Sequence, residues 1–162
     1  MYTFSIIIPT KGRETLARTL ASVCHQLAHG DEILVMRLDC EWGNKARDMM
    51  VEKASGTHLM FIDDDDAYLE GALQTVRERI SEEPDRVHFF QMRYKDGKVL
   101  WGHPSLVESN VGTPMIVVPN GVVGLWENKG GTASDFHFMV DTMSRRGDEP
   151  VWHEDVIAVI RP

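Results

Sequence analysis

Four consecutive aspartates, Asp63 to Asp66, directly follow the apolar segment His58 to Ile62. A short apolar run of this kind is typical of a buried strand, so the expected strand leads into a cluster of like charges. At about 4 Å and an effective dielectric near 20, each like-charged pair costs on the order of 4 kcal/mol. The cluster therefore favours a bound counter-ion. The alternative is a solvated acidic turn that stabilises the next helix through its dipole.

Alternation along a strand would place Asp63 and Asp65 on one side of the chain and Asp64 and Asp66 on the other. Two carboxylates that face the same way suit Mg²⁺ or Mn²⁺, because these ions prefer oxygen ligands and also bind phosphate oxygens. Ligands of open α/β sheets bind beyond the carboxyl ends of the strands, where this cluster is expected. The sequence therefore predicts a divalent cation site here.

Strand and helix patterns alternate at short intervals in the first half of the chain, which predicts an α/β fold. The expected strands there are 4–8, 32–36 and 58–62, and the expected helices are 14–27, 44–54 and 69–80. In the second half, the expected strands are 87–92, 99–101, 115–118, 122–126 and 156–160, with one helix over 134–147. No linker or repeat interrupts the pattern, so we expect a single domain over residues 1–162.

Charge and composition exclude some functions. The chain of 162 residues has 17 Lys plus Arg against 25 Asp plus Glu, a net charge of −8. This balance argues against non-specific binding to nucleic acid or to an anionic membrane. Neither a signal-peptide pattern nor a membrane-spanning segment is evident, so a cytoplasmic location is expected. The sequence neither predicts nor excludes a homodimer, because it contains no coiled-coil or exposed apolar repeat that would indicate one.

Three segments, in this order and spacing, resemble family 2 glycosyltransferases, which have the GT-A fold. Phe4–Arg13 is similar to the opening strand and loop of the family, and Gly43–Gly56 is similar to its next block. Phe61–Asp66 resembles the strand that ends in the Asp-x-Asp motif. The resemblance implies a Rossmann-like mixed sheet flanked by helices, a nucleoside-diphosphate sugar donor, and Mn²⁺ or Mg²⁺ between carboxylate and diphosphate. Residues 1–85 would bind the nucleotide sugar, and residues 86–162 would bind the acceptor and supply catalysis.

The resemblance also assigns roles to individual residues. Those that would bind the nucleotide sugar are Pro9, Thr10, Arg13, Asp39, Arg47, Asp63 and Asp64. Asp65 would be the principal metal ligand, and Asp63 would approach the ribose or the metal. The alternatives are surface salt bridges for Arg13 and Arg47 and a loop turn for Asp39.

Sugar transfer with inversion needs a carboxylate that takes the proton of the acceptor. Ser134–Gly147 resembles the late helix that carries this base in the family, with Ser134 in place of a glutamate, so the resemblance implies that Asp135 is the base. A helix N-terminus would keep this carboxylate ionised and lower its basicity. The alternative role of Asp135 is charge complementarity alone.

His153 resembles the late histidine that serves as a metal ligand in several GT-A enzymes. The alternative is that His153 is a hydrogen-bonded structural residue. In that case Asp155 could take its place as the metal ligand. The polymerase motif Gln-x-x-Arg-Trp is absent from the sequence, which favours a single transfer. The leading hypothesis is a metal-dependent, inverting glycosyltransferase that acts on an unknown hydroxyl acceptor. A nucleotidyltransferase and a catalytically inactive nucleotide-sugar-binding module are the alternatives.

Overall fold

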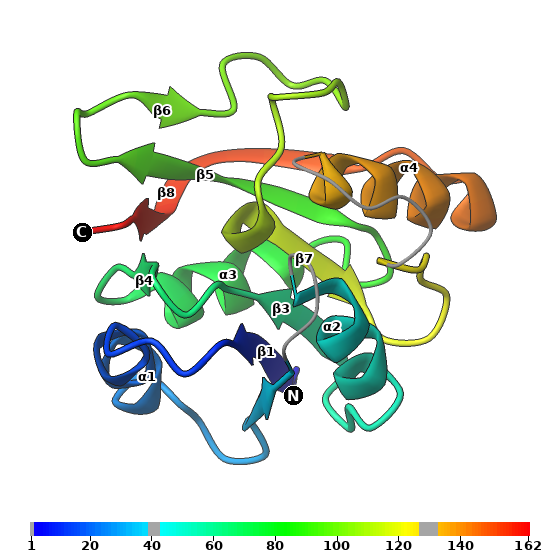
Figure 1. The fold of residues 1–162 in the computed structure, drawn as a ribbon. Helices are drawn as coiled ribbons and strands as arrows, with labels where there is room; N and C mark the ends of the chain where they lie inside the picture. The colour runs from blue at the N-terminus through cyan, green and yellow to red at the C-terminus, as the bar shows by residue number, and fades with distance from the viewer. Residues whose placement is uncertain (1, 39–42, 127–132) are drawn as a thin grey trace.

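The structure is a computed structural model that describes residues 2–38, 43–126 and 133–162. The strands are β1 (Phe4–Thr10), β2 (Glu32–Arg37), β3 (His58–Phe61), β4 (Ala67–Tyr68), β5 (His88–Tyr94), β6 (Val99–Leu100), β7 (Ile116–Pro119) and β8 (Val151–Ile160). The helices are α1 (Leu16–Cys24), α2 (Asn44–Val51), α3 (Ala72–Ile80), α4 (Ser134–Arg146) and the 3₁₀ helix η2 (Thr113–Met115). Figure 1 shows this arrangement.

The described strands form one mixed sheet in the order β2-β1-β3-β7-β5-β8-β4, with β6 paired to β5. Strand β1 is parallel to β2 and β3, whereas β7 is antiparallel to both of its neighbours, β3 and β5. Strand β8 is parallel to β5 and therefore runs in the same direction as β3. The carboxyl ends of β1, β3 and β8 consequently meet at one edge of the sheet.

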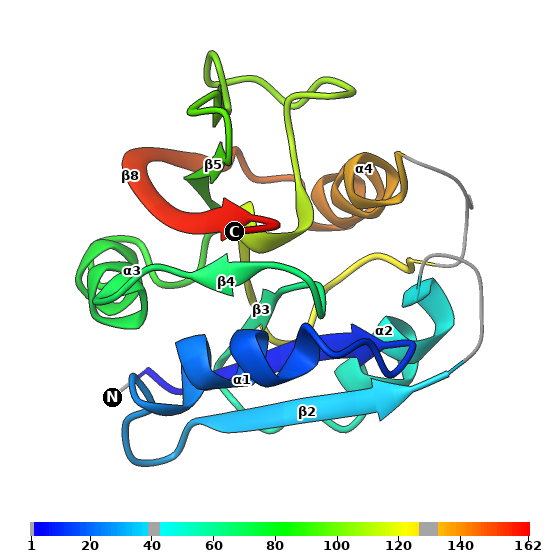
Figure 2. The same ribbon diagram turned by 60° about the vertical axis from the view of Figure 1, so that its left-hand side comes forward.

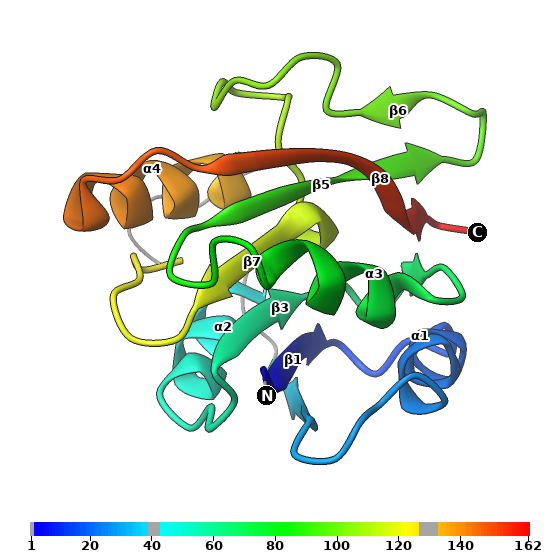
Figure 3. The ribbon, with the colours of Figure 1, turned by 180° about the vertical axis from the view of Figure 1, so that it is seen from behind.

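Helices cover both faces of this sheet. In Figures 1 and 3, which are views from opposite sides, α2 and α4 lie in front of the strands in the first view and α3 in the second. Helix α2 packs against β1 and β2, α3 packs against β8, and α1 lies against β4, as Figure 2 shows. All seven residues of β1 are buried, as expected for a central strand of β-branched residues covered on both faces.

Aromatic side chains position α4 relative to β3. The ring of Phe138 in α4 stacks on Trp126 with 4.3 Å between centroids, and both rings contact Phe61, the last residue of β3. All three side chains are buried. This packing brings the first turn of α4 toward the carboxyl end of β3.

The strand expected over residues 122–126 is wrong. The backbone N–H groups of Gly124 and Leu125 donate to Thr142 and Asp141 of α4, and that of Trp126 donates to Asp48 of α2. Side chains of two helices therefore satisfy this segment, and it does not need a neighbouring strand. Other expected elements are present with shifted ends: β8 starts five residues earlier than expected, at Val151.

The described part of the chain contains no helix with the length and apolar character that a bilayer crossing requires.

Candidate active site

The aspartates after β3 form a turn. The N–H of Asp66 donates to the carbonyl oxygen of Asp63 at 3.1 Å, so the chain leaves the extended conformation that strand alternation assumes. Carboxylate oxygens of Asp63, Asp65 and Asp66 all lie within 4.8 Å of one another. The prediction that Asp66 faces the same way as Asp64 is therefore wrong. We call Asp63, Asp65 and Asp66 the acidic cluster.

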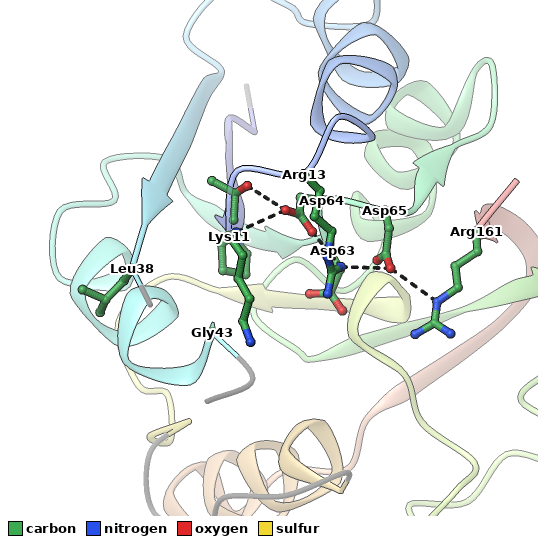
Figure 4. A pocket seen from close by; sticks show the side chains of 10 residues that line it. Lys11, Arg13, Leu38, Gly43, Asp63, Asp64, Asp65 and Arg161 are labelled. Atoms are coloured by element: carbon green, nitrogen blue, oxygen red, sulfur yellow. Dashed lines mark hydrogen bonds and ion pairs between the residues drawn. The ribbon is translucent and has the colours of Figure 1, made fainter. Parts of the chain in front are cut away.

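Asp64 points away from the acidic cluster and holds the loop that follows β1. Its Oδ2 accepts hydrogen bonds from the hydroxyl of Thr10 at 2.6 Å and from the N–H of Lys11 at 3.3 Å. Its Oδ1 accepts one from Nη1 of Arg13 at 3.0 Å. Figure 4 shows these contacts. The carboxylate is nearly fully buried, and its hydrogen bonds hold the first loop against the aspartate turn.

Arg13 and Arg47 both reach the aspartates. The Nη1 of Arg13 lies 2.9 Å from Oδ2 of Asp65, which links the first loop to the acidic cluster. Arg47 in α2 is only 3% exposed, forms an ion pair with Asp63 and lies over the ring of Trp126 at 4.6 Å. Arg47 is therefore not a surface salt bridge, whereas the half-exposed Arg13 forms ion pairs with two mostly buried carboxylates. Asp39 lies outside the described residues.

Gly43 allows α2 to start close to Pro9. It is the N-cap residue of α2 and has a φ of +71°, a conformation that glycine adopts without strain. A Cβ atom at this position would lie 2.8 Å from Cβ of Pro9. The close approach puts Arg47, one turn into the helix, within reach of Asp63.

Two clefts meet at the acidic cluster. The loop cleft, of about 380 Å³, lies along the segment Pro9–Arg13. The hairpin cleft, of about 760 Å³, lies between the acidic cluster, the β5–β6 hairpin and the start of α4. Asp63, Asp65 and Arg161 line both clefts. A ligand in one cleft therefore shares these side chains with a ligand in the other.

Asp135 lies in the first turn of α4 and lines the hairpin cleft. Burial raises its pKa to about 6, and the charge of Asp63 contributes, against a hydrogen bond from the N–H of Phe136 and the charge of Arg47. The expectation that the helix N-terminus lowers the basicity of this carboxylate is therefore wrong, because burial outweighs the helix. At neutral pH most of Asp135 is ionised, yet it is a stronger base than an exposed aspartate.

The acidic cluster suits a hard divalent cation. Its donors are three carboxylates, the ligand type that Mg²⁺ and Mn²⁺ prefer. Burial, followed by the charge of Asp63, raises the pKa of Asp66 to about 7, so the third carboxylate is only partly ionised without a cation nearby. A positive ion beside it would favour the ionised form. Asp63, Asp65 and Asp66 are the residues that would hold such an ion.

The structure does not bring His153 to the acidic cluster. This residue lies near the start of β8, where its Nε2 is 2.9 Å from Nδ1 of His88 and its ring stacks on Phe90. His88 Nε2 lies 2.9 Å from the carbonyl oxygen of Glu83, to which it can only donate, so His88 Nδ1 is the acceptor and His153 the donor in their contact. Asp155 forms an ion pair with Arg79 and is not in the cluster either.

Arg161 is the β8-side residue beside the cluster, and sequence reasoning did not select it. Its Nε lies 3.4 Å from Oδ2 of Asp65, and its backbone N–H donates to Oδ1 of Asp66 at 3.1 Å. The sequence does contain a signal for Arg161: a charged residue directly after a strand parallel to β3 lies at the same sheet edge as Asp63. The length and pairing of β8 have to be known first.

The chain belongs to glycosyl transferase family 2, because the sequence profile of that family matches residues 32–138. The structure has the GT-A fold that the sequence resemblance implied. No curated protein sequence matches the chain significantly.

Solved structures with a similar fold include TarS from S. aureus, with a TM-score of 0.75 and 16% identity over 99% of this chain and 37% of that chain. Residues 1–349 of S. aureus TarS in complex with UDP-GlcNAc match with a TM-score of 0.65 and 16% identity, over 97% of this chain and 58% of that one. A197 from STIV matches with a TM-score of 0.61 and 18% identity, over 98% and 84%. The chain thus spans little more than a third of the first of these TarS chains.

Proposed function

We propose that this protein transfers one sugar from a nucleoside-diphosphate sugar to a hydroxyl acceptor, with inversion at the anomeric carbon. The observation that carries the proposal is the position of the acidic cluster between two clefts, with Asp135 in only one of them. Family membership and the GT-A fold support it. The UDP-GlcNAc complex of the similar TarS structure favours a uridine nucleotide as the first donor to test.

The donor would lie across both clefts. Its nucleotide would occupy the loop cleft, with the diphosphate at Asp63 and Asp65, and the sugar would extend into the hairpin cleft. The ion pair between the buried Arg47 and the partly exposed Asp63 would hold that wall of the site in place. The acceptor would enter the hairpin cleft from the side of Asp135, opposite the leaving diphosphate.

Asp135 would accept the proton of the acceptor hydroxyl. The hydroxyl oxygen forms a bond to the anomeric carbon from the face opposite the diphosphate, and the bond between that carbon and the diphosphate oxygen breaks. The electron pair of the broken bond leaves with the diphosphate. A base with a pKa near 6 is ionised at neutral pH and still takes up a proton effectively.

A divalent cation held by Asp63, Asp65 and Asp66 would neutralise charge on the diphosphate. Both the metal and the inverting outcome are parts of this proposal. The cytoplasmic location stays a prediction from sequence.

Calorimetry with UDP, GDP and TDP, each with and without Mn²⁺, tests the donor site. We expect binding of at least one of these diphosphates and tighter binding with Mn²⁺. Incubation with the matching nucleotide sugar should release nucleoside diphosphate. Release of pyrophosphate from a nucleoside triphosphate would instead support a nucleotidyltransferase.

Two variants separate an enzyme from a binding module. Asp65→Ala should abolish the effect of Mn²⁺, and Asp135→Asn should lower turnover by a factor of about 10²–10⁴ while the donor still binds. Asp155→Asn is the matched control, because this aspartate pairs with Arg79 away from both clefts and should leave both properties unchanged. Nucleotide binding without turnover of any donor by the parent protein would support the binding module.

A further inference from the structure

We infer that Arg161 binds the diphosphate of the donor and stabilises its charge as the bond to the sugar breaks. This inference rests on the proposed function. It assigns a positioning and charge-stabilising role to a residue that follows β8. Arg161 thus belongs to the second half of the sequence, whereas the loop after β1 belongs to the first half.

Arg161 lies where the two clefts meet. Its side chain lines both the loop cleft and the hairpin cleft, as do Asp63 and Asp65. Figure 4 shows the aspartates between Lys11 on one side and Arg161 on the other. The junction of the clefts is where the bond between sugar and diphosphate would lie. Arg161 is therefore a cation at the point where the leaving group would gain charge, in addition to Lys11 and Arg13 of the loop cleft.

Hydrogen bonds fix the backbone around Arg161. Its N–H donates to Asp66 at 3.1 Å. The carbonyl oxygen of the next residue, Pro162, accepts a hydrogen bond from Arg18 at 2.7 Å, and the same guanidinium donates to the carbonyl oxygen of Asp65 at 3.2 Å. The residue is thus attached on both sides to the loop that carries the acidic cluster.

The guanidinium itself is loosely held. Its side chain is 79% exposed, and the ion pair with Asp65 has a distance of 3.4 Å between Nε and Oδ2. Arg13 lies closer to the same oxygen, at 2.9 Å. An exposed ion pair contributes at most about 1 kcal/mol. Arg161 can therefore turn from Asp65 to a diphosphate at little cost, while Asp65 keeps Arg13 as a partner.

The chemistry of the ligand follows from the guanidinium. Arginine presents planar, paired N–H donors that match two oxygens of one phosphate, and such charge-assisted pairs are stronger than neutral hydrogen bonds. The ligand class is therefore a diphosphate ester. A nucleoside without phosphate would not use this residue.

The experiment compares UDP and uridine by calorimetry, with and without Mn²⁺, for the parent protein and for Arg161→Ala, Arg161→Lys and Arg79→Ala. Arg161→Ala keeps the backbone N–H that Asp66 accepts, so the fold should be retained, and a thermal melt checks this. Arg79→Ala is the control, because Arg79 is a half-exposed arginine paired with Asp155 outside both clefts.

We expect Arg161→Ala to raise the dissociation constant of UDP at least tenfold and to leave uridine binding unchanged. The dissociation constant of UDP for Arg161→Lys should lie between those for the parent protein and Arg161→Ala, because lysine keeps the charge but lacks the paired N–H donors. Equal UDP affinity in Arg161→Ala and the parent protein would overturn the inference and leave the proposed function intact. An equal loss of uridine and UDP binding would also overturn it. No binding of UDP, GDP or TDP to the parent protein would contradict the proposed function itself.

Discussion

The hydroxyl of Thr10 donates a hydrogen bond of 2.6 Å to Oδ2 of Asp64, and both residues are buried. This contact joins the end of β1 to the loop that follows β3. The same hydroxyl accepts the N–H of Gly12 at 2.8 Å, so it also shapes the first loop.

Thr10→Val should therefore destabilise the protein, because it leaves the buried carboxylate of Asp64 with one donor fewer at nearly constant volume. We expect a loss of about 1–3 kcal/mol in the free energy of unfolding. Urea denaturation measures this loss. Thr3→Val is the control near the start of β1, because Thr3 is partly exposed and bonds to Thr57. An equal loss in both variants would show that the Thr10 contact has no special role.

Gly43→Ala should weaken nucleotide binding as well as stability. The added Cβ would meet Pro9, and the residue would have to keep a φ of +71°. The left-handed conformation alone costs about 1–2 kcal/mol for a residue with a side chain. Relief of the clash would move the start of α2, and with it Arg47. Calorimetry with UDP should show weaker binding, whereas Gly97→Ala, with no atom within 4 Å of the new Cβ, should change stability alone.

The rate of sugar transfer should depend on the ionisation of Asp135. Burial raises the pKa of this carboxyl to about 6, and only the ionised form accepts a proton. We expect the rate to fall as the pH drops through about 6 and to be level above 7. Asp135→Asn should lower the rate constant by a factor of about 10²–10⁴ at pH 7.5. A retained rate, or a pH profile without this step, would argue against Asp135 as the base.

The same variant should be more stable than the parent protein at neutral pH. A raised pKa means that the folded state binds the proton of Asp135 more tightly than the unfolded state, whose carboxyl has a pKa near 3.8. Below about pH 4 the Asp135 carboxyl is protonated in both states, so its burial carries no penalty from ionisation. The protein loses stability as the pH rises from there through about 6. Because Asp135 is partly exposed, we expect a gain of about 1–2 kcal/mol for Asp135→Asn at pH 7.5. The gain should vanish near pH 4 in denaturation curves.

Acid should destabilise the fold through His88. Burial lowers the pKa of this imidazole to about 4, with the charge of His153 contributing, so the unfolded state binds the proton more tightly than the folded state. The contribution of His88 to stability is complete above about pH 6.5 and is lost as the pH falls through about 4. The loss is on the order of 3 kcal/mol from this residue.

His88→Phe tests this prediction. It should be less stable than the parent protein at pH 7.5, because the bond to the carbonyl oxygen of Glu83 is lost. Its stability should nevertheless change less between pH 6.5 and 4. The pKa values of His58 and His153 are also lowered, mainly by burial, so some slope should remain. An unchanged slope would assign the acid effect to those two residues.

Periodicity and burial made the first half of the fold predictable from sequence. The β-branched run in β1 and the apolar run before Asp63 leave few alternatives to buried parallel strands. The strand expected at Val122–Trp126 failed because the partners of its N–H groups, among them Asp48 and Asp141, are distant side chains. No local pattern reports such contacts.

Motif order brought together the residues of the first loop and the aspartates, but three features of the site needed the structure. The turn that groups Asp66 with Asp63 depends on a hydrogen bond that strand alternation ignores. The raised pKa of Asp135 depends on burial by side chains from several elements. Arg161, and not the predicted His153, lies beside the acidic cluster, and this placement depends on where β8 starts.

The position of β7 has a consequence for synthesis of the chain. Strand β3 forms hydrogen bonds with β1 on one side and with β7 on the other, and β7 begins only at Ile116. While the ribosome adds the more than fifty residues between them, the backbone groups on the second side of β3 lack their native partners. Unpaired strand edges of nascent chains attract other chains. Chaperone engagement is therefore expected in the interval between translation of β3 and translation of β7.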